Sequence, residues 1–418
     1  MNFYRYVLII ICFIYCSAYG QVNNGNKQSW KEGWFEIHHI NAKLGNSVFF
    51  IFPDGTTLLY DAGQMDYDSM SDQKKAEYCL STADTLSVAK QIKEYINNFY
   101  PSASNGIDYA VISHFHADHY GTITDKSPKS KKGNYQLSGI TELYEYLPFR
   151  HLFDRGFPDY SYPSDLNDYY DKVDRRPTFQ NYRNFVDYLK SNKRTHIESL
   201  HVGSNTQIAT QKGGKYKFHV RNLKKNNEYW SGNGTENYFL TFSDSPLIKE
   251  GRFNENPLSI ALLFSYGDFK YYIGGDISGV NDWPDVDIET VLAPVIGKVD
   301  VMSLHHHGYK DATNSFFLNT LSPQVIVQQS LHVPHFQTNI LTRLVQYGGD
   351  VYALHYPSNV PQDIRDIVSR THKDSNVHVV IRVKPEGKIY FIDTYESNKG
   401  RLILKNTFGP YYSSKKQQ

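Results

Sequence analysis

Residues 107–121 read IDYAVISHFHADHYG, and this stretch decides the fold. Its first half alternates apolar side chains at Ile107, Tyr109 and Val111, which predicts a buried β-strand. The run H-F-H-A-D-H that follows places three histidines and an aspartate within residues 114–119. A divalent metal ion needs several lone-pair donors converging on one point, and imidazole and carboxylate groups supply them. The stretch therefore predicts a metal site at the end of a strand.

The spacing of the four donors predicts two metal sites. At a strand end His114 and His116 share one face, because side chains alternate. If the chain then turns into a helix, Asp118 and His119 project towards a second point nearby. One short segment thus supplies ligands to both sites.

The segments before this stretch, and the region directly after it, predict a layered α/β domain. Short apolar runs over residues 34–63 indicate a strand meander with a turn at residues 53–55. An apolar stripe over residues 88–99 predicts an amphipathic helix, with Asp84 as its N-cap. The polar, tyrosine-rich region at about 121–230 has little periodicity, and we expect an insertion beside the active site there.

The C-terminal half continues the alternation of strands and helices. Residues 259–276 predict two strands, residues 299–308 a strand that ends in histidines, and residues 385–387 the turn of a closing hairpin. We expect one α/β domain over residues 30–400, followed by a C-terminal tail at residues 401–418.

The charge balance disfavours highly charged partners. The 418 residues include 44 Lys and Arg against 43 Asp and Glu, a formal charge of +1. This gives no bulk electrostatic attraction for nucleic acid or an anionic membrane, so nucleic acid is possible but not favoured. A small-molecule or surface-linked ester substrate is the expected partner.

The N-terminus predicts export. Residues 1–20 combine one basic residue, a short apolar run and small residues before a cleavage site, as in a signal peptide. We expect a secreted or periplasmic protein beginning at Gln21, without a stable membrane span because the apolar run is short. A lipid anchor at Cys16 is less favoured, because the residues before it fit that signal poorly. After cleavage Cys79 is the single cysteine, which excludes an intramolecular disulfide.

The motif H-x-H-x-D-H after a buried strand resembles the signature of the metallo-β-lactamase superfamily. Three further segments resemble motifs of the same superfamily: LLYDAG at residues 58–63, YYIGGD at 271–276 and DVMSLHHHG at 300–308. The resemblance implies an αββα sandwich with the insertion after the histidine motif.

Residues 34–395 resemble one branch of that superfamily, which contains the hydrolase domain of competence-type DNA-uptake proteins and secreted phosphodiesterases or phosphorylcholine esterases. The opening meander, the NENPLSIALLFSYGDFKYYIGGD block at residues 254–276, the HHG run and the closing hairpin carry this resemblance. The branch usually has V-G-Q-G-D where this chain has A-K-L-G-N at residues 42–46, so its acidic residue is replaced.

The resemblance also implies roles for the first five site residues. It implies that His114 and His116 bind metal one, that Asp118 and His119 bind metal two, and that Asp276 bridges both. We expect Asp118 in addition to act as a catalytic residue that holds the attacking hydroxide in line.

The last ligand of metal two is one of His305, His306 and His307. The branch ends its strand in H-H-G with the first histidine as ligand, which selects His306 and leaves His307 as a catalytic residue facing the substrate. Asp61 and Gly63 are expected to support the ligand loop, and Tyr120 is an alternative hydrogen-bond donor to the substrate. A third histidine for metal one, which this branch often lacks, has the following candidates: His151, His196, His201 and His219.

Such a site predicts a hydrolase with two Zn²⁺ per chain, Mn²⁺ being the alternative metal. Two divalent ions about 3.5 to 4 Å apart lower the pKa of a bridging water towards about 7, which provides a metal-bound hydroxide as nucleophile. We expect a phosphoester substrate, either a phosphodiester or a phosphorylcholine-like ester. The alternatives are a lactamase or lactonase-type hydrolase and a non-catalytic, metal-containing binding protein.

Overall fold

The computed structural model describes residues 29–80, 87–173, 175–241, 247–249, 251–398 and 401–413. The predicted signal peptide, including Cys16, together with Gln21 and Asp84, lies outside these residues. No helix in the described ranges combines the length and the apolar character needed to cross a bilayer.

The first of two mixed sheets has nine strands in the order β18-β17-β16-β1-β2-β3-β4-β5-β6. Strands β3 to β6 are parallel to one another, and the other neighbours pair antiparallel. In chain order the strands are β1 (Phe35–His39), β2 (Val48–Ile51), β3 (Thr57–Tyr60), β4 (Ile107–Val111), β5 (Phe149–Phe153), β6 (His196–Ile197), β16 (His378–Val383), β17 (Ile389–Asn398) and β18 (Arg401–Tyr412).

The second sheet also has nine strands, in the order β15-β14-β13-β12-β11-β10-β7-β8-β9. Strands β11 to β15 are parallel, whereas β7 to β10 and the β10–β11 pair are antiparallel. In chain order the strands are β7 (Phe218–Lys225), β8 (Glu228–Trp230), β9 (Asn237–Phe239), β10 (Ala261–Tyr266), β11 (Phe269–Ile273), β12 (Val301–Ser303), β13 (Val325–Gln328), β14 (Asp350–Ala353) and β15 (His372–Ser375).

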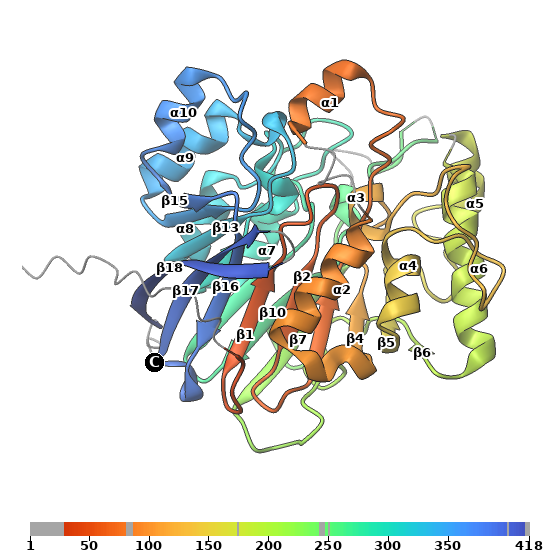
Figure 1. Ribbon diagram of the computed structural model, residues 1–418, viewed down its shortest axis with the longest axis horizontal. Helices are drawn as coiled ribbons and strands as arrows, with labels where there is room; N and C mark the ends of the chain where they lie inside the picture. Colours follow the sequence, from red (N-terminus) through yellow and green to blue (C-terminus); the bar gives the residue numbers. More distant parts are fainter. Residues whose placement is uncertain are drawn as a thin grey trace, which may run out of the picture.

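Helices cover the outer face of each sheet (Figure 1). The first sheet is covered by α2 (Val88–Phe99), α4 (Gly139–Tyr146), α5 (Leu166–Lys172) and α6 (Arg176–Asn192). The second sheet is covered by α7 (Glu289–Ile296), α8 (Ser315–Leu321), α9 (Thr338–Tyr347) and α10 (Gln362–Val368). Two further helices are α1 (Asp72–Tyr78) and the four-residue α3 (Ala117–Tyr120), which directly follows the loop after β4.

An aromatic core joins the inner faces of the two sheets. Phe50 on β2 stacks on Phe264 on β10 with ring centroids 4.4 Å apart, and Phe35 on β1 packs against both rings. Separate apolar clusters bind the helices to the outer faces. The layer order is therefore helix, sheet, sheet, helix, and the expected αββα sandwich is confirmed.

Three local expectations differ from the structure. Helix α2 begins at Val88 with Ser87 as its N-cap, whose side chain accepts a hydrogen bond from the Lys90 backbone N–H. Most of the region 121–230 is built into the sandwich, since β5 and β6 extend the first sheet and β7 and β8 the second. Residues 401–412 form the edge strand β18 rather than a tail. Strands β5, β6 and β8 are short and β18 lies at an edge, so their sequences carry little periodicity.

Candidate metal centre

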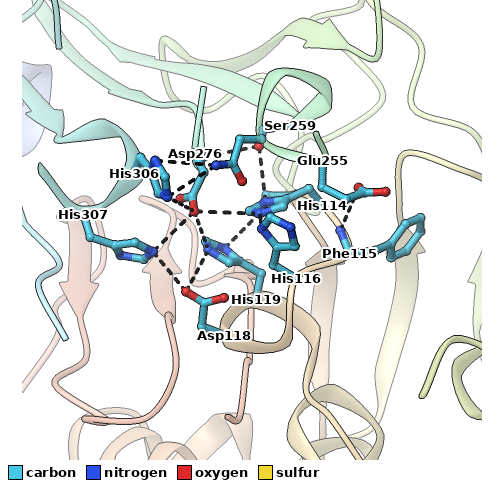
Figure 2. Close-up of polar contacts among 12 residues, drawn as sticks. His114, Phe115, His116, Asp118, His119, Glu255, Ser259, Asp276, His306 and His307 are labelled. Carbon is cyan, nitrogen blue, oxygen red and sulfur yellow. Dashed lines mark hydrogen bonds and ion pairs between the residues drawn. The ribbon is translucent and has the colours of Figure 1, made fainter. Parts of the chain in front are cut away.

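Loops from both sheets meet at the carboxyl ends of their parallel strands. Asp61 follows β3, residues 112–116 follow β4, Asp276 lies just beyond β11, and the short helix η4 (His305–Gly308) follows β12. Parallel neighbouring strands end at the same edge of a sheet, and the two sheets face each other, so these four loops converge. Figure 2 shows the histidines and carboxylates of the loops directed towards Asp276.

The first donor group contains His114, His116 and Asp276. His114 Nε2 lies 3.0 Å from His116 Nδ1 and 3.8 Å from Asp276 Oδ2. One atom from each residue therefore lies within 4.8 Å of the others, which is close enough for a shared cation.

The second donor group contains Asp118, His119, Asp276 and His307. The distance from Asp276 Oδ2 is 3.2 Å to His119 Nε2 and 3.4 Å to His307 Nε2. Asp118 Oδ2 lies 3.2 Å from His307 Nε2 and 3.6 Å from His119 Nε2. Because Asp276 belongs to both groups, its carboxylate is placed to bridge two ions (Figure 2).

Two nitrogen atoms in the second group are better placed to bind a metal ion than to form a hydrogen bond. His119 Nε2 and His307 Nε2 are buried without a well-directed hydrogen-bond partner, although carboxylate oxygens lie close by. A buried polar atom left without a partner costs about 1–3 kcal/mol. A cation between these nitrogens and the oxygens would satisfy both, so the donors present fit a divalent metal ion.

The charges of the cluster support the same fit. Burial alone raises the pKa of Asp276, but His119 and then His307 hold it well below its usual range. Burial disfavours charge on His307, yet the Asp276 carboxylate raises the pKa of His307 to about 10. The buried carboxylates are therefore stabilised by positive charge nearby. A divalent cation would supply this charge and replace the protons that the histidines otherwise carry.

The far nitrogens of three histidines of the donor groups are held by other groups. His119 Nδ1 donates to Asp61 Oδ2 at 2.7 Å, and His307 Nδ1 donates to a backbone carbonyl oxygen at 2.9 Å. His114 Nδ1 lies 3.2 Å from the Ser259 hydroxyl. Such contacts fix which nitrogen faces the metal and how each ring is turned.

Asp61 connects the site to the end of β3. Besides holding His119, its Oδ1 accepts a hydrogen bond from the Ser113 backbone N–H at 2.7 Å. Asp61 itself has φ 63°, a left-handed backbone that directs its buried side chain at the ligand loop. The sequence placed Asp61 in a supporting role, and these contacts describe how it would act.

Asp61→Asn is expected to weaken metal binding by about 10- to 100-fold, the usual effect of removing a group that orients a ligand. The amide would present a donor to His119 Nδ1–H or to Ser113, and one of these contacts would be lost. Titration against a chelator of known affinity measures the change, with the exposed Asp125→Asn as control. Equal metal affinity in the two variants would remove Asp61 from the site.

Glu255 is a second supporting residue, and the sequence interpretation missed it. Its Oε2 accepts the Phe115 backbone N–H at 3.2 Å, in the middle of the H-F-H run. The carboxylate is buried and is held by Arg155, with Nε to Oε2 at 2.7 Å, and by the Tyr170 hydroxyl. Glu255 lies in the N-E-N-P block, but its arginine partner is 100 positions away, so no local pattern links the two.

His306 is not in either donor group, and His307 occupies the place expected for it. His306 Nδ1 donates to Asp311 at 2.7 Å, while its Nε2 stays 3.8 Å from Asp276 Oδ2. Both histidines have a left-handed backbone, with φ 43° and 57°, so the chain turns within the run and redirects the side chains. The resemblance to the branch's H-H-G run selected His306, whereas the donor geometry favours His307. Strand alternation does not extend through such a turn, so residue spacing does not decide between the two.

The other candidate residues are placed as follows. His305 is buried away from the donors, between Glu289 and the Tyr272 hydroxyl. Tyr120 ends α3 and lines a cavity beside His116. None of the four candidates for a third histidine of metal one joins a donor group among the described residues: His151 on β5, His196 on β6, His201 in the loop after β6, and His219 on β7.

Comparisons with known proteins leave the family open. No protein-family model matches the chain, and no curated protein sequence matches it. Among solved structures the chain is similar to CmlA, a diiron β-hydroxylase from Streptomyces venezuelae, with 12% identity and a TM-score of 0.38. The similarity covers 86% of this chain and 55% of CmlA, so this chain matches about half of that protein's length. The αββα sandwich and the donor groups are therefore the observations on which a function must rest.

Proposed function

We propose that this protein is a metal-dependent hydrolase that holds two divalent metal ions, expected to be zinc. The observation that carries the proposal is the Asp276 carboxylate shared by two groups of donors. His114 and His116 would complete metal one, and Asp118, His119 and His307 would complete metal two. This assignment replaces His306 with His307 as the last ligand. Structural zinc sites are usually closed by Cys and His, so carboxylate-containing groups favour catalysis.

Two divalent ions bound there would polarise the attacked ester and lower the pKa of a bound water towards about 7. Residues of the chain would position the water and the substrate around these ions. Asp118 is partly exposed to solvent, so its carboxylate can accept a proton or hold a water in line with the attacked ester. His306 is oriented by Asp311 and its side chain is 20% exposed, so in its doubly protonated form its Nε2 would donate a hydrogen bond to a substrate or leaving group.

A phosphoester is the proposed substrate, with a lactam or lactone as the alternative. The near-neutral net charge of +1 favours a small or surface-linked ester over a long nucleic acid. Export also remains a proposal, carried by the sequence of residues 1–20.

The test uses the chain from Gln21 onward, purified and supplied with zinc or manganese. Metal content is measured by mass spectrometry, and turnover is measured with and without chelator on a bis-aryl phosphodiester, an aryl phosphorylcholine and a chromogenic cephalosporin. We expect about two metals per chain and phosphoester cleavage that stops when chelator is added. Cleavage of the cephalosporin alone would support the lactamase alternative. Bound metal without turnover on any substrate would support the binding-protein alternative.

A further inference from the structure

A cavity of about 280 Å³ adjoins the metal centre. The donor residues His116 and Asp118 form part of its wall, and Phe115 gives it an apolar side. The remaining polar lining includes Tyr120 and Arg175. A substrate whose reacting group lies at the metal centre would therefore extend one arm into this cavity.

Tyr120 presents a hydroxyl group that the described residues leave without a hydrogen-bond partner. The residue is only 5% exposed, and its ring packs edge-on against Phe115 and Tyr182, with centroids 5.6 Å and 5.7 Å away. A phenol is protonated near neutral pH, so this hydroxyl is a hydrogen-bond donor. A hydroxyl on a largely buried tyrosine that lines a cavity, without a protein partner among the described residues, is available to a ligand.

Arg175 brings a positive charge to the same cavity. Within the described part of the chain no carboxylate forms an ion pair with its guanidinium, and the residue is exposed. Arg175 and His116 line the same cavity, which places the Arg175 charge near the donors. The guanidinium is therefore free to bind an anion from solution.

The N-terminus of α6 adds to this positive end. Arg175 is the N-cap of this helix of 17 residues, whose first turn has no side-chain cap. Thr178, in that first turn, also lines the cavity. The first backbone N–H groups of a helix, together with its dipole, favour an anion at this position.

We propose that this cavity, hereafter the anion pocket (Tyr120, Arg175 and Thr178), binds a second anionic group on the substrate, a phosphate or a carboxylate. The inference rests on the proposed function and narrows its substrate class to esters that carry a separate anion on one arm. Asp118, a proposed metal ligand, is the acidic residue in the lining, so the pocket offers an anion the Arg175 guanidinium together with the hydroxyl groups of Tyr120 and Thr178. A cationic arm such as choline would meet the Arg175 charge and be disfavoured.

The test measures binding rather than turnover, on the zinc-loaded full chain from Gln21. Calorimetry compares ω-carboxyalkyl phosphonates with two to four methylenes against alkyl phosphonates of matched length, and a bisphosphonate series distinguishes phosphate from carboxylate. We expect the second anion to strengthen binding about tenfold or more at one chain length. Arg175→Gln is expected to abolish this gain, whereas the exposed Arg194→Gln is expected to retain it.

Tyr120→Phe provides a second variant that keeps the ring packing and removes only the hydroxyl. We expect it to reduce the gain from the second anion several-fold. Equal binding of charged and uncharged arms by the wild type, or a gain that survives Arg175→Gln, would overturn the anion pocket. If charged arms are preferred but no ester is cleaved, the pocket stands and the hydrolase proposal fails. If an ester is cleaved but charged and uncharged arms bind equally, the hydrolase proposal stands and the anion pocket fails.

Discussion

Asp276→Asn is expected to lower turnover by about 10³-fold or more. This is at least the loss in rate that follows when a central electrostatic group is removed from an active site. The substitution removes the one charge that both donor groups share. An amide still offers one oxygen, but it no longer balances two divalent ions in a buried site. Metal content should therefore fall from about two per chain to one or fewer.

Mass spectrometry of the purified protein and steady-state kinetics at saturating metal measure the two effects. Asp282→Asn, at an exposed position six residues further on, is the matched control and should leave both unchanged. Circular dichroism should show the fold retained in both variants. Two metals per chain with undiminished turnover in Asp276→Asn would refute the bridging role.

Gly63→Ala is expected to destabilise the protein by about 3 kcal/mol or more, the upper end of the cost of overpacking. A Cβ atom at Gly63 would lie 1.8 Å from the Asp118 carbonyl oxygen and 2.4 Å from the His119 backbone nitrogen. These are backbone atoms that cannot turn aside, and Gln64 N donates to the Ala117 carbonyl oxygen at 2.8 Å beside them. The added methyl group must push α3, and with it two proposed ligands, away from Asp276.

Denaturant unfolding measures the loss in stability, and metal content reports the displaced ligands. Gly213→Ala is a suitable control, because nothing lies within 4 Å of a Cβ placed there. We expect that control to remain within about 1 kcal/mol of the wild type. A Gly63→Ala protein as stable as the control, with full metal content, would contradict this prediction, because α3 would then accommodate the methyl group without cost.

The local patterns of the sequence predicted most of the framework. Apolar alternation before His114 predicted β4, and the change to a helical turn after it predicted α3. The hairpin turn at residues 385–387 is also where it was expected. Such features depend on neighbours in the chain, so composition and spacing are enough to indicate them. Weakly periodic segments were different: β5 and β7 acquire their place by pairing with strands distant in sequence.

The sequence alone placed the cluster of donors on one loop, because residues 107–121 carry strand period and donor spacing together, and the resemblance of its motifs implied the αββα architecture. The tertiary structure decided which histidine after β12 faces Asp276, since the left-handed backbone of His306 and His307 follows from how that turn is packed. It also decided that Glu255 supports the histidine loop, because the residue that holds Glu255, Arg155, is 100 residues away in the sequence. Local spacing sets the direction of a side chain only while the backbone stays regular, and beyond that point contacts between distant segments set it.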